Sequence, residues 1–133
     1  MIPPTRGIVA AVGILALSAC GASSSRLNAL ELTAILDLRS IEAAQLQYSA
    51  QNGRFAVNLS ELRAADFIPA SLASGEKDGF KFTMTATPNG FTINASPKKY
   101  GETGRRSFYS DETTVIRQNW ANAPASASSP ELK

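Results

Sequence analysis

Cys20 is the only cysteine in this 133-residue chain, which also has no histidine. A cysteine thiolate is both a nucleophile and a metal ligand. The absence of histidine removes the commonest general base and metal ligand. A lone cysteine also cannot form a disulfide within its own chain. The residues around Cys20 therefore decide what its thiol can do.

The acidic residues do not suggest a catalytic site. Asp111 and Glu112 are adjacent, whereas Asp66 and Asp78 fall in predicted turns, and no spacing pairs any of them. No base is placed to activate a serine, and no glycine-rich loop that could cradle a phosphate is present. We therefore expect no catalytic residue, no resident metal and no cofactor.

Residues 1–19 have the layout of a secretory signal. A short start containing Arg6 precedes the uncharged apolar run Gly7–Leu17, and small residues lead from there to Cys20. An apolar core of about 7–15 residues fits a cleaved signal, whereas a spanning helix needs about 20. We expect residues 1–19 to be removed.

The run Leu17-Ser18-Ala19-Cys20 resembles the lipobox of bacterial lipoproteins. The resemblance implies that the signal peptidase recognises Leu17, Ser18 and Ala19 and cuts before Cys20, whose thiol carries the lipid. One acyl chain anchors only marginally, so the two or three chains of a lipoprotein are needed for stable attachment. The expected location is the cell envelope, lipid-anchored on the periplasmic side. Gly21, where some inner-membrane lipoproteins have aspartate, favours the outer membrane. A chance cysteine in an ordinary cleaved signal is the alternative.

The composition predicts one nearly neutral domain. The chain has 13 basic and 11 acidic residues, so loss of Arg6 leaves 12 against 11. Binding to nucleic acid needs a clustered basic face, and only Lys98-Lys99 and Arg105-Arg106 approach one. We interpret these as solvated charges at strand ends and expect no nucleic-acid partner.

The first half of the mature chain has helical periodicity. Residues 20–26 are expected to be the lipidated cysteine and a tether, of which Gly21–Ser25 reach at most about 18 Å. Apolar residues then recur at steps of three and four, which predicts a helix from Leu27 to about Ala50, ended by Asn52-Gly53. We expect a sheet to cover this stripe, although a coiled coil remains an alternative. The stripe consists of Leu27, Leu30, Ala34, Ile35, Leu38, Ile41, Ala44 and Tyr48.

The second half changes to a period of two. After a short helical segment at residues 59–65, alternation predicts strands over 80–86 and 91–96, joined by a turn at Pro88-Asn89-Gly90. A third strand is expected at 106–110 and a short fourth at 114–117. Residues 119–133 have the composition of a disordered tail, with Trp120 as a stray contact. The expected fold class is α+β, with one long N-terminal helix packed on a three- or four-stranded antiparallel sheet over residues 27–118.

The sequence of this domain resembles the periplasmic part of type IV pilins and type II secretion pseudopilins over residues 32–117. The matching stretches are Ala34–Ile41 with Ala44, Gln45 and Tyr48; Asn52–Phe55 with Leu59, Leu62, Ile68 and Leu72–Gly75; and Gly79–Phe82, Gly90–Pro97 and Gly104–Asp111. The resemblance implies a pilin-like fold. Some pseudopilins bind calcium near their last strands, where Ser110, Asp111 and Glu112 lie, but calcium takes six to eight oxygen ligands and we expect no metal.

The N-terminus departs from the pilin pattern. Pilins continue from a glycine into a long uninterrupted apolar helix with a glutamate five residues into the mature chain. Here the apolar run stops at Cys20, and the fifth residue after Gly7 is Val12. The lipid anchor is therefore expected to replace the membrane-spanning half of the pilin helix.

These features favour a non-enzymatic structural or interaction module held at the membrane, with an envelope protein as its partner. The alternative is a minor pseudopilin or pilin-like component of a type II secretion or type IV pilus system. A small-ligand binder or enzyme is a third possibility, and its sign would be an apolar cleft with converging polar groups. An exposed Tyr100 in the loop Lys98–Gly104 would favour partner binding.

Overall fold

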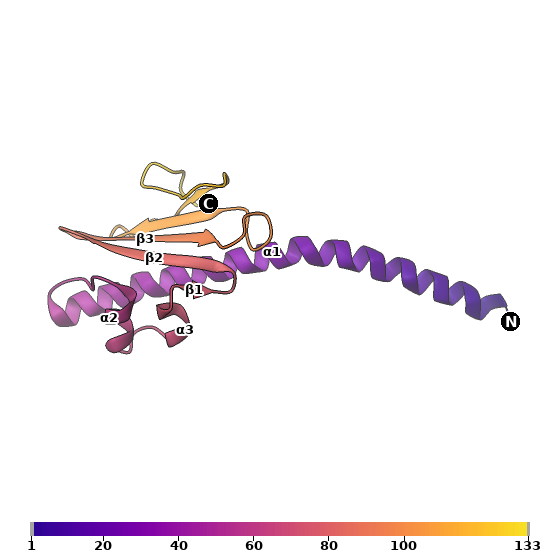
Figure 1. Ribbon diagram of the computed structural model, residues 1–133, viewed down its shortest axis with the longest axis horizontal. Coiled ribbons are helices and arrows are strands. Elements are labelled where there is room, and N and C mark those ends of the chain that lie inside the picture. The colour runs from indigo at the N-terminus through magenta and orange to yellow at the C-terminus, as the bar shows by residue number, and fades with distance from the viewer. Residues whose placement is uncertain (1, 133) are drawn as a thin grey trace.

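The computed structural model describes the backbone of residues 2–132 and the side chains of residues 25–132. A long helix lies along one face of an antiparallel sheet, with two short helices beside it (Figure 1). The strands follow one another in the order β1-β2-β3-β4-β5. The elements are α1 (Ile2–Asn52), α2 (Leu59–Ala64), α3 (Ala70–Ala73), β1 (Glu76–Lys77), β2 (Phe80–Thr87), β3 (Gly90–Pro97), β4 (Ser107–Asp111) and β5 (Arg117–Asn119).

The α+β class with one long helix is confirmed, but the predicted strand count was wrong. The sheet has five strands rather than three or four. The predicted fourth strand at 114–117 was also misplaced, because β5 comprises Arg117–Asn119. The additional strand, β1, has only two residues, which pair as Glu76 with Lys81 and Lys77 with Phe80. A strand this short cannot show an alternating pattern, so only the pairing in the folded chain reveals it.

The core lies between α1 and the sheet, as the helical stripe predicts. Ala34, Leu38 and Ile41 are buried against strand residues of the inner sheet face. In the β2–β3 pair, alternate residues such as Phe82 and Ala95 oppose each other, which is the register that places one face of each strand in the core. Because the sheet covers this stripe, a coiled coil through the same residues is excluded.

A glutamine on α1 fixes the segment that leads from the helix to α2. Gln45 is fully buried, and its side-chain amide donates to the carbonyl oxygen of Ala56 at 2.9 Å and accepts from the Ala56 N–H at 2.8 Å. Asn58 then caps α2 by accepting a hydrogen bond from the Glu61 N–H at 2.9 Å. These hydrogen bonds fix the position of the segment between α1 and α2, from which the chain leads on toward the sheet.

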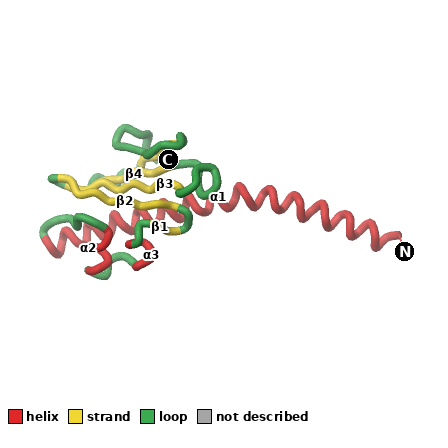
Figure 2. Tube along the Cα trace, in the orientation of Figure 1, coloured by secondary structure: helices red, strands yellow, loops and turns green. Residues whose placement is uncertain are grey.

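The prediction of a disordered tail from residue 119 was wrong for the described residues up to 132. This segment lies on the face of the sheet opposite α1 (Figure 2). Ser107 donates to the carbonyl of Ala123 at 2.6 Å, and Asn94 donates to that of Ala125 at 2.9 Å. With this segment in place, four consecutive residues of β4, Ser107–Ser110, are buried, so both faces of that strand are covered.

None of the helices, as far as the structure describes them, combines the length and the apolar character needed to cross a membrane.

Candidate functional site

The predicted lipidation site lies outside the residues whose side chains are described. This holds for Cys20 and for the recognition residues Leu17, Ser18 and Ala19, so their roles stay predictions. The backbone of the whole predicted tether, residues 20–26, belongs to α1, and the side chains described in it are those of Ser25 and Arg26. The described side chains therefore begin at Ser25, five residues after the proposed anchor Cys20.

The acidic residues that the sequence singled out have separate structural roles. Asp111 accepts hydrogen bonds from the Thr113 hydroxyl at 2.5 Å, from the Thr113 N–H at 3.0 Å and from the Tyr109 hydroxyl at 3.1 Å. Burial opposes ionisation of Asp111, but these hydrogen bonds prevail and lower its pKa. Asp66 and Asp78 sit in turns with φ of 66° and 51°. Within the described residues, no three potential metal-binding side chains come together.

Two other carboxylates, which sequence reasoning did not single out, are buried on α1. Glu31 is 1% exposed and accepts from the Arg105 N–H at 2.6 Å, while its other oxygen lies 3.1 Å from the Arg106 guanidinium. Arg106 in turn donates to Gln118 at 2.8 Å. This network joins α1 to the start of β4 and to β5. The sequence feature that could have indicated this network is the position of Glu31, a charged residue next to the apolar stripe of the helix.

Glu42 is the second buried carboxylate. Its side chain is buried against β4 and accepts a hydrogen bond from the Ser110 hydroxyl. Burial raises the pKa of Glu42 above its ordinary value of 4.5, although the Ser110 hydrogen bond and the charge of Arg39 oppose the rise. Glu42 is therefore a group that binds protons more strongly in the folded chain than in the unfolded chain.

We expect this raised pKa to make the pH profile of stability depend on Glu42. Ionised Glu42 opposes folding, so its unfavourable contribution diminishes as the pH falls from neutral through the raised pKa toward 4.5. Glu42→Gln should raise the free energy of unfolding at neutral pH and flatten this part of the profile. Urea denaturation at a series of pH values measures both effects. If the free energy of unfolding depends on pH in the same way in the unsubstituted protein and in Glu42→Gln, the prediction is wrong.

Glu61 provides the opposite control. Hydrogen bonds from Arg54 lower the pKa of Glu61 to about 2, so its stabilising contribution is present above the ordinary 4.5 and is lost as the pH falls toward about 2. Glu61→Gln should therefore lower the free energy of unfolding by a constant amount above pH 4.5 and change the slope of the profile only on the acid side of 4.5.

The outer face of α1 carries apolar residues that nothing in the described chain covers. We call the residues at its 3–4 spacing the outer seam. Leu32, Leu36 and Leu46 in it are 57%, 58% and 49% exposed. Spacing of this kind forms the contact line of packed helices. The outer seam consists of Ala29, Leu32, Leu36, Arg39, Ala43, Leu46 and Ala50, all exposed and opposite the core stripe.

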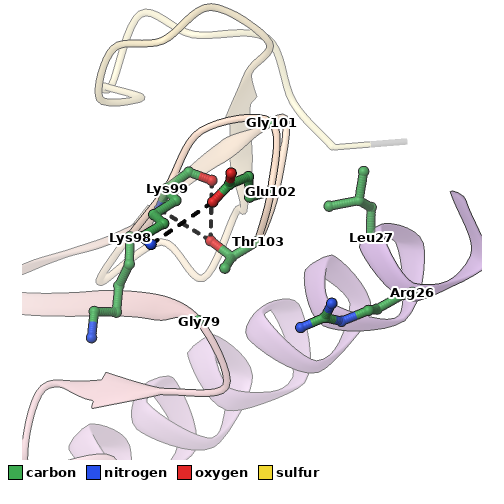
Figure 3. A pocket seen from close by; sticks show the side chains of 8 residues that line it. All are labelled: Arg26, Leu27, Gly79, Lys98, Lys99, Gly101, Glu102 and Thr103. Atoms are coloured by element: carbon green, nitrogen blue, oxygen red, sulfur yellow. Dashed lines mark hydrogen bonds and ion pairs between the residues drawn. The ribbon is translucent and has the colours of Figure 1, made fainter. Parts of the chain in front are cut away.

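A second exposed region lies where α1 enters the domain. We call it the loop end, and it comprises Arg26, the loop Lys98–Arg105 and Trp120. A hollow of about 650 Å³ separates α1 from the loop, and Figure 3 shows Arg26 and Leu27 on its helix side and Lys99 and Glu102 on its loop side. Its lining consists of charged residues, glycines, Leu27 and Thr103, so it is not the apolar cleft expected of a small-ligand site.

Two exposed aromatic side chains belong to the loop end but are not part of the lining of this hollow. Tyr100, which the sequence analysis singled out, is 43% exposed, and its hydroxyl donates to the carbonyl of Trp120 at 2.7 Å. Trp120 is 57% exposed, and the Arg106 guanidinium lies 4.7 Å from the centre of its ring. The expectation that Trp120 makes only a stray contact was wrong, because the buried Glu31–Arg106 pair and Tyr100 hold it in place.

Comparisons of the chain with protein-family models, with curated proteins and with solved structures found no match.

Proposed function

We propose that this protein is a lipid-anchored lipoprotein of the cell envelope, whose pilin-like domain binds a partner protein and has no enzymatic activity. The anchor is the lipid on Cys20, in the sequence context Leu17-Ser18-Ala19. The domain is held on the periplasmic side, and in a cell with two membranes the outer membrane is favoured.

The order of elements supports the pilin-like assignment. A long helix, a connecting segment with the short helices α2 and α3, and an antiparallel sheet in sequential strand order follow one another. The same stretches carry the residues that resemble pilins and pseudopilins. Together, the order and the residues favour this fold over other α+β arrangements.

The observation that carries the interaction role is the outer seam of α1. Its apolar side chains are exposed in a line on the helix face opposite the core. A helix of a single soluble domain usually carries polar residues on that face. A partner helix with matching spacing would remove these leucines from water, which is the main driving force for such packing.

The alternative is a minor pseudopilin or pilin-like component of a type II secretion or type IV pilus system. The same seam favours it, because a neighbouring pilin-like subunit would supply a helix. The sequence around Cys20 weighs against it, since the apolar run ends where a filament subunit would continue its helix. Co-purification with filaments would support the alternative.

The mass of the mature N-terminus tests the anchor. We expect a peptide that begins at a diacylglyceryl-modified Cys20. An unmodified or methylated terminus at Ile8 would overturn the lipoprotein proposal and favour a pilin.

Crosslinking in intact envelopes tests the partner role. Leu36→Glu places a charge at the centre of the outer seam and should reduce the crosslinked complex by at least about tenfold, as expected for a central interface residue. Because Leu36 is exposed, the stability of the domain should change by no more than about 0.5 kcal/mol. Val57→Glu, at an exposed apolar residue outside the outer seam, is the matched control. Equal yields from both variants would contradict the role of the seam.

A further inference from the structure

The loop end lies close to the proposed anchor along the chain. Arg26 is six residues after Cys20, which corresponds to about 9 Å of helix or at most about 22 Å of extended chain. Electrostatic attraction at physiological salt extends about 8 Å. A membrane that holds the lipid on Cys20 is therefore within the reach of this part of the domain.

Positive charge predominates on this surface. Arg26, Lys98, Lys99 and Arg105 are all exposed. Two carboxylates oppose these four cations, with Lys98 lying 3.5 Å from Glu76 and Lys99 lying 4.0 Å from Glu102. Both pairs are solvent-exposed, so they hold their lysines only weakly. The lysines can therefore exchange these carboxylates for other anions.

The aromatic residues have the chemistry of a membrane interface. Tryptophan and tyrosine concentrate at the level of lipid headgroups, where one part of the ring is apolar and another is polar. Trp120 and Tyr100 are exposed beside the basic loop, and their backbone and side-chain contacts hold them together. Basic residues next to exposed aromatic rings form a surface that fits an anionic lipid bilayer.

We propose that the loop end docks on the anionic headgroups of the membrane that carries the anchor, with Trp120 and Tyr100 at the interface. This inference rests on the proposed lipid anchor at Cys20. Docking fixes the orientation of the domain, with α1 rising from the membrane and the outer seam turned sideways toward a partner. The lipid chains supply attachment, and the loop end supplies orientation.

Trp120 is the only tryptophan in the chain and reports directly on this contact. The lipidated full chain is reconstituted in vesicles of phosphatidylcholine alone, or of phosphatidylcholine with phosphatidylglycerol. Both contain a lipid with a nitroxide quencher on its headgroup. We expect quenching and a blue shift of Trp120 emission on the anionic vesicles and little change on the neutral ones.

A charge variant with a matched control completes the test. Each basic residue at an anionic surface contributes about fivefold to binding, so Arg26→Gln with Lys99→Gln should weaken docking at least about tenfold and abolish most of the quenching. Arg54→Gln with Arg63→Gln removes two exposed charges outside both the loop end and the outer seam and should leave docking unchanged. Equal quenching on both vesicle types, or in both variants, would overturn the docking proposal.

The two proposals can fail separately. If the mass of the reconstituted chain shows lipid on Cys20 but Trp120 is not quenched, the loop end does not dock and the anchor stands. If the chain carries no lipid, the anchor proposal fails. The unlipidated full chain is then added to the same vesicles, and the loss or retention of anionic-lipid quenching decides the docking proposal by itself.

Discussion

Replacing Glu31 with alanine is expected to lower the free energy of unfolding by about 3–5 kcal/mol, because it removes one partner of a buried ion pair. Glu31 is almost fully buried, and Arg106 remains largely enclosed by the rings of Phe108 and Trp120, 5.2 and 4.7 Å away. The variant also leaves the Arg105 N–H without its acceptor. Urea denaturation followed by circular dichroism measures the loss.

A double variant separates the energy of the Glu31–Arg106 interaction from the effect of each side chain on its other neighbours. Glu31→Met with Arg106→Met removes both charges and keeps much of the volume, so it should recover a large part of the loss. The fluorescence of Trp120 should change in Arg106→Met, since the guanidinium lies over the ring. If the double variant is as unstable as the sum of the two single variants, the two side chains do not act as a pair.

Replacing Gln45 with alanine is expected to cost about 2–4 kcal/mol. The substitution leaves the N–H and the carbonyl of fully buried Ala56 without their partners, and each such group costs about 1–3 kcal/mol. It also opens a cavity beside Met84, whose sulfur lies 3.0 Å from the Gln45 amide nitrogen. Thermal and urea unfolding measure the effect.

Three further variants show whether this loss of stability comes from the missing hydrogen bonds or from the cavity. Gln45→Leu fills the space without restoring the hydrogen bonds, so it should remain nearly as unstable as the alanine variant. Gln45→Glu keeps an acceptor for the Ala56 N–H but buries a charge, so it should be destabilised more at neutral pH than in acid. Gln47→Ala changes an exposed glutamine on the same helix and should have an effect within about 0.5 kcal/mol. A fully stable Gln45→Leu variant would show that packing, rather than hydrogen bonding, is what Gln45 supplies.

The candidate surfaces were only partly visible in the sequence. Tyr100 could be singled out because an aromatic residue in a polar loop is conspicuous. Leu32, Leu36 and Leu46 were hidden, because their spacing is as typical of a core stripe as that of Leu38 and Ile41. The covered stripe could be predicted, but only the tertiary structure shows that these three leucines on the opposite face are exposed and that no described segment covers them.

By itself, the sequence determined the main elements and the apolar core stripe of the long helix. The periods of 3.6 and 2 are local properties, so β2, β3, β4 and this stripe could be predicted, whereas the burial of Glu31, Glu42 and Gln45 on the same helix face could not. The proposed anchor also rests on a contiguous run, Leu17–Cys20.

The tertiary structure decided what depends on contacts between distant residues. Two features join segments that are far apart in the chain: the Glu31–Arg106 network and the packing of residues 120–132 on β4. The two-residue strand β1 likewise becomes visible only through its pairing with β2. A composition rich in alanine, serine and proline predicts disorder when a segment is considered alone. This segment is ordered because its backbone carbonyls accept hydrogen bonds from side chains of the sheet, and its packing leaves both faces of β4 buried.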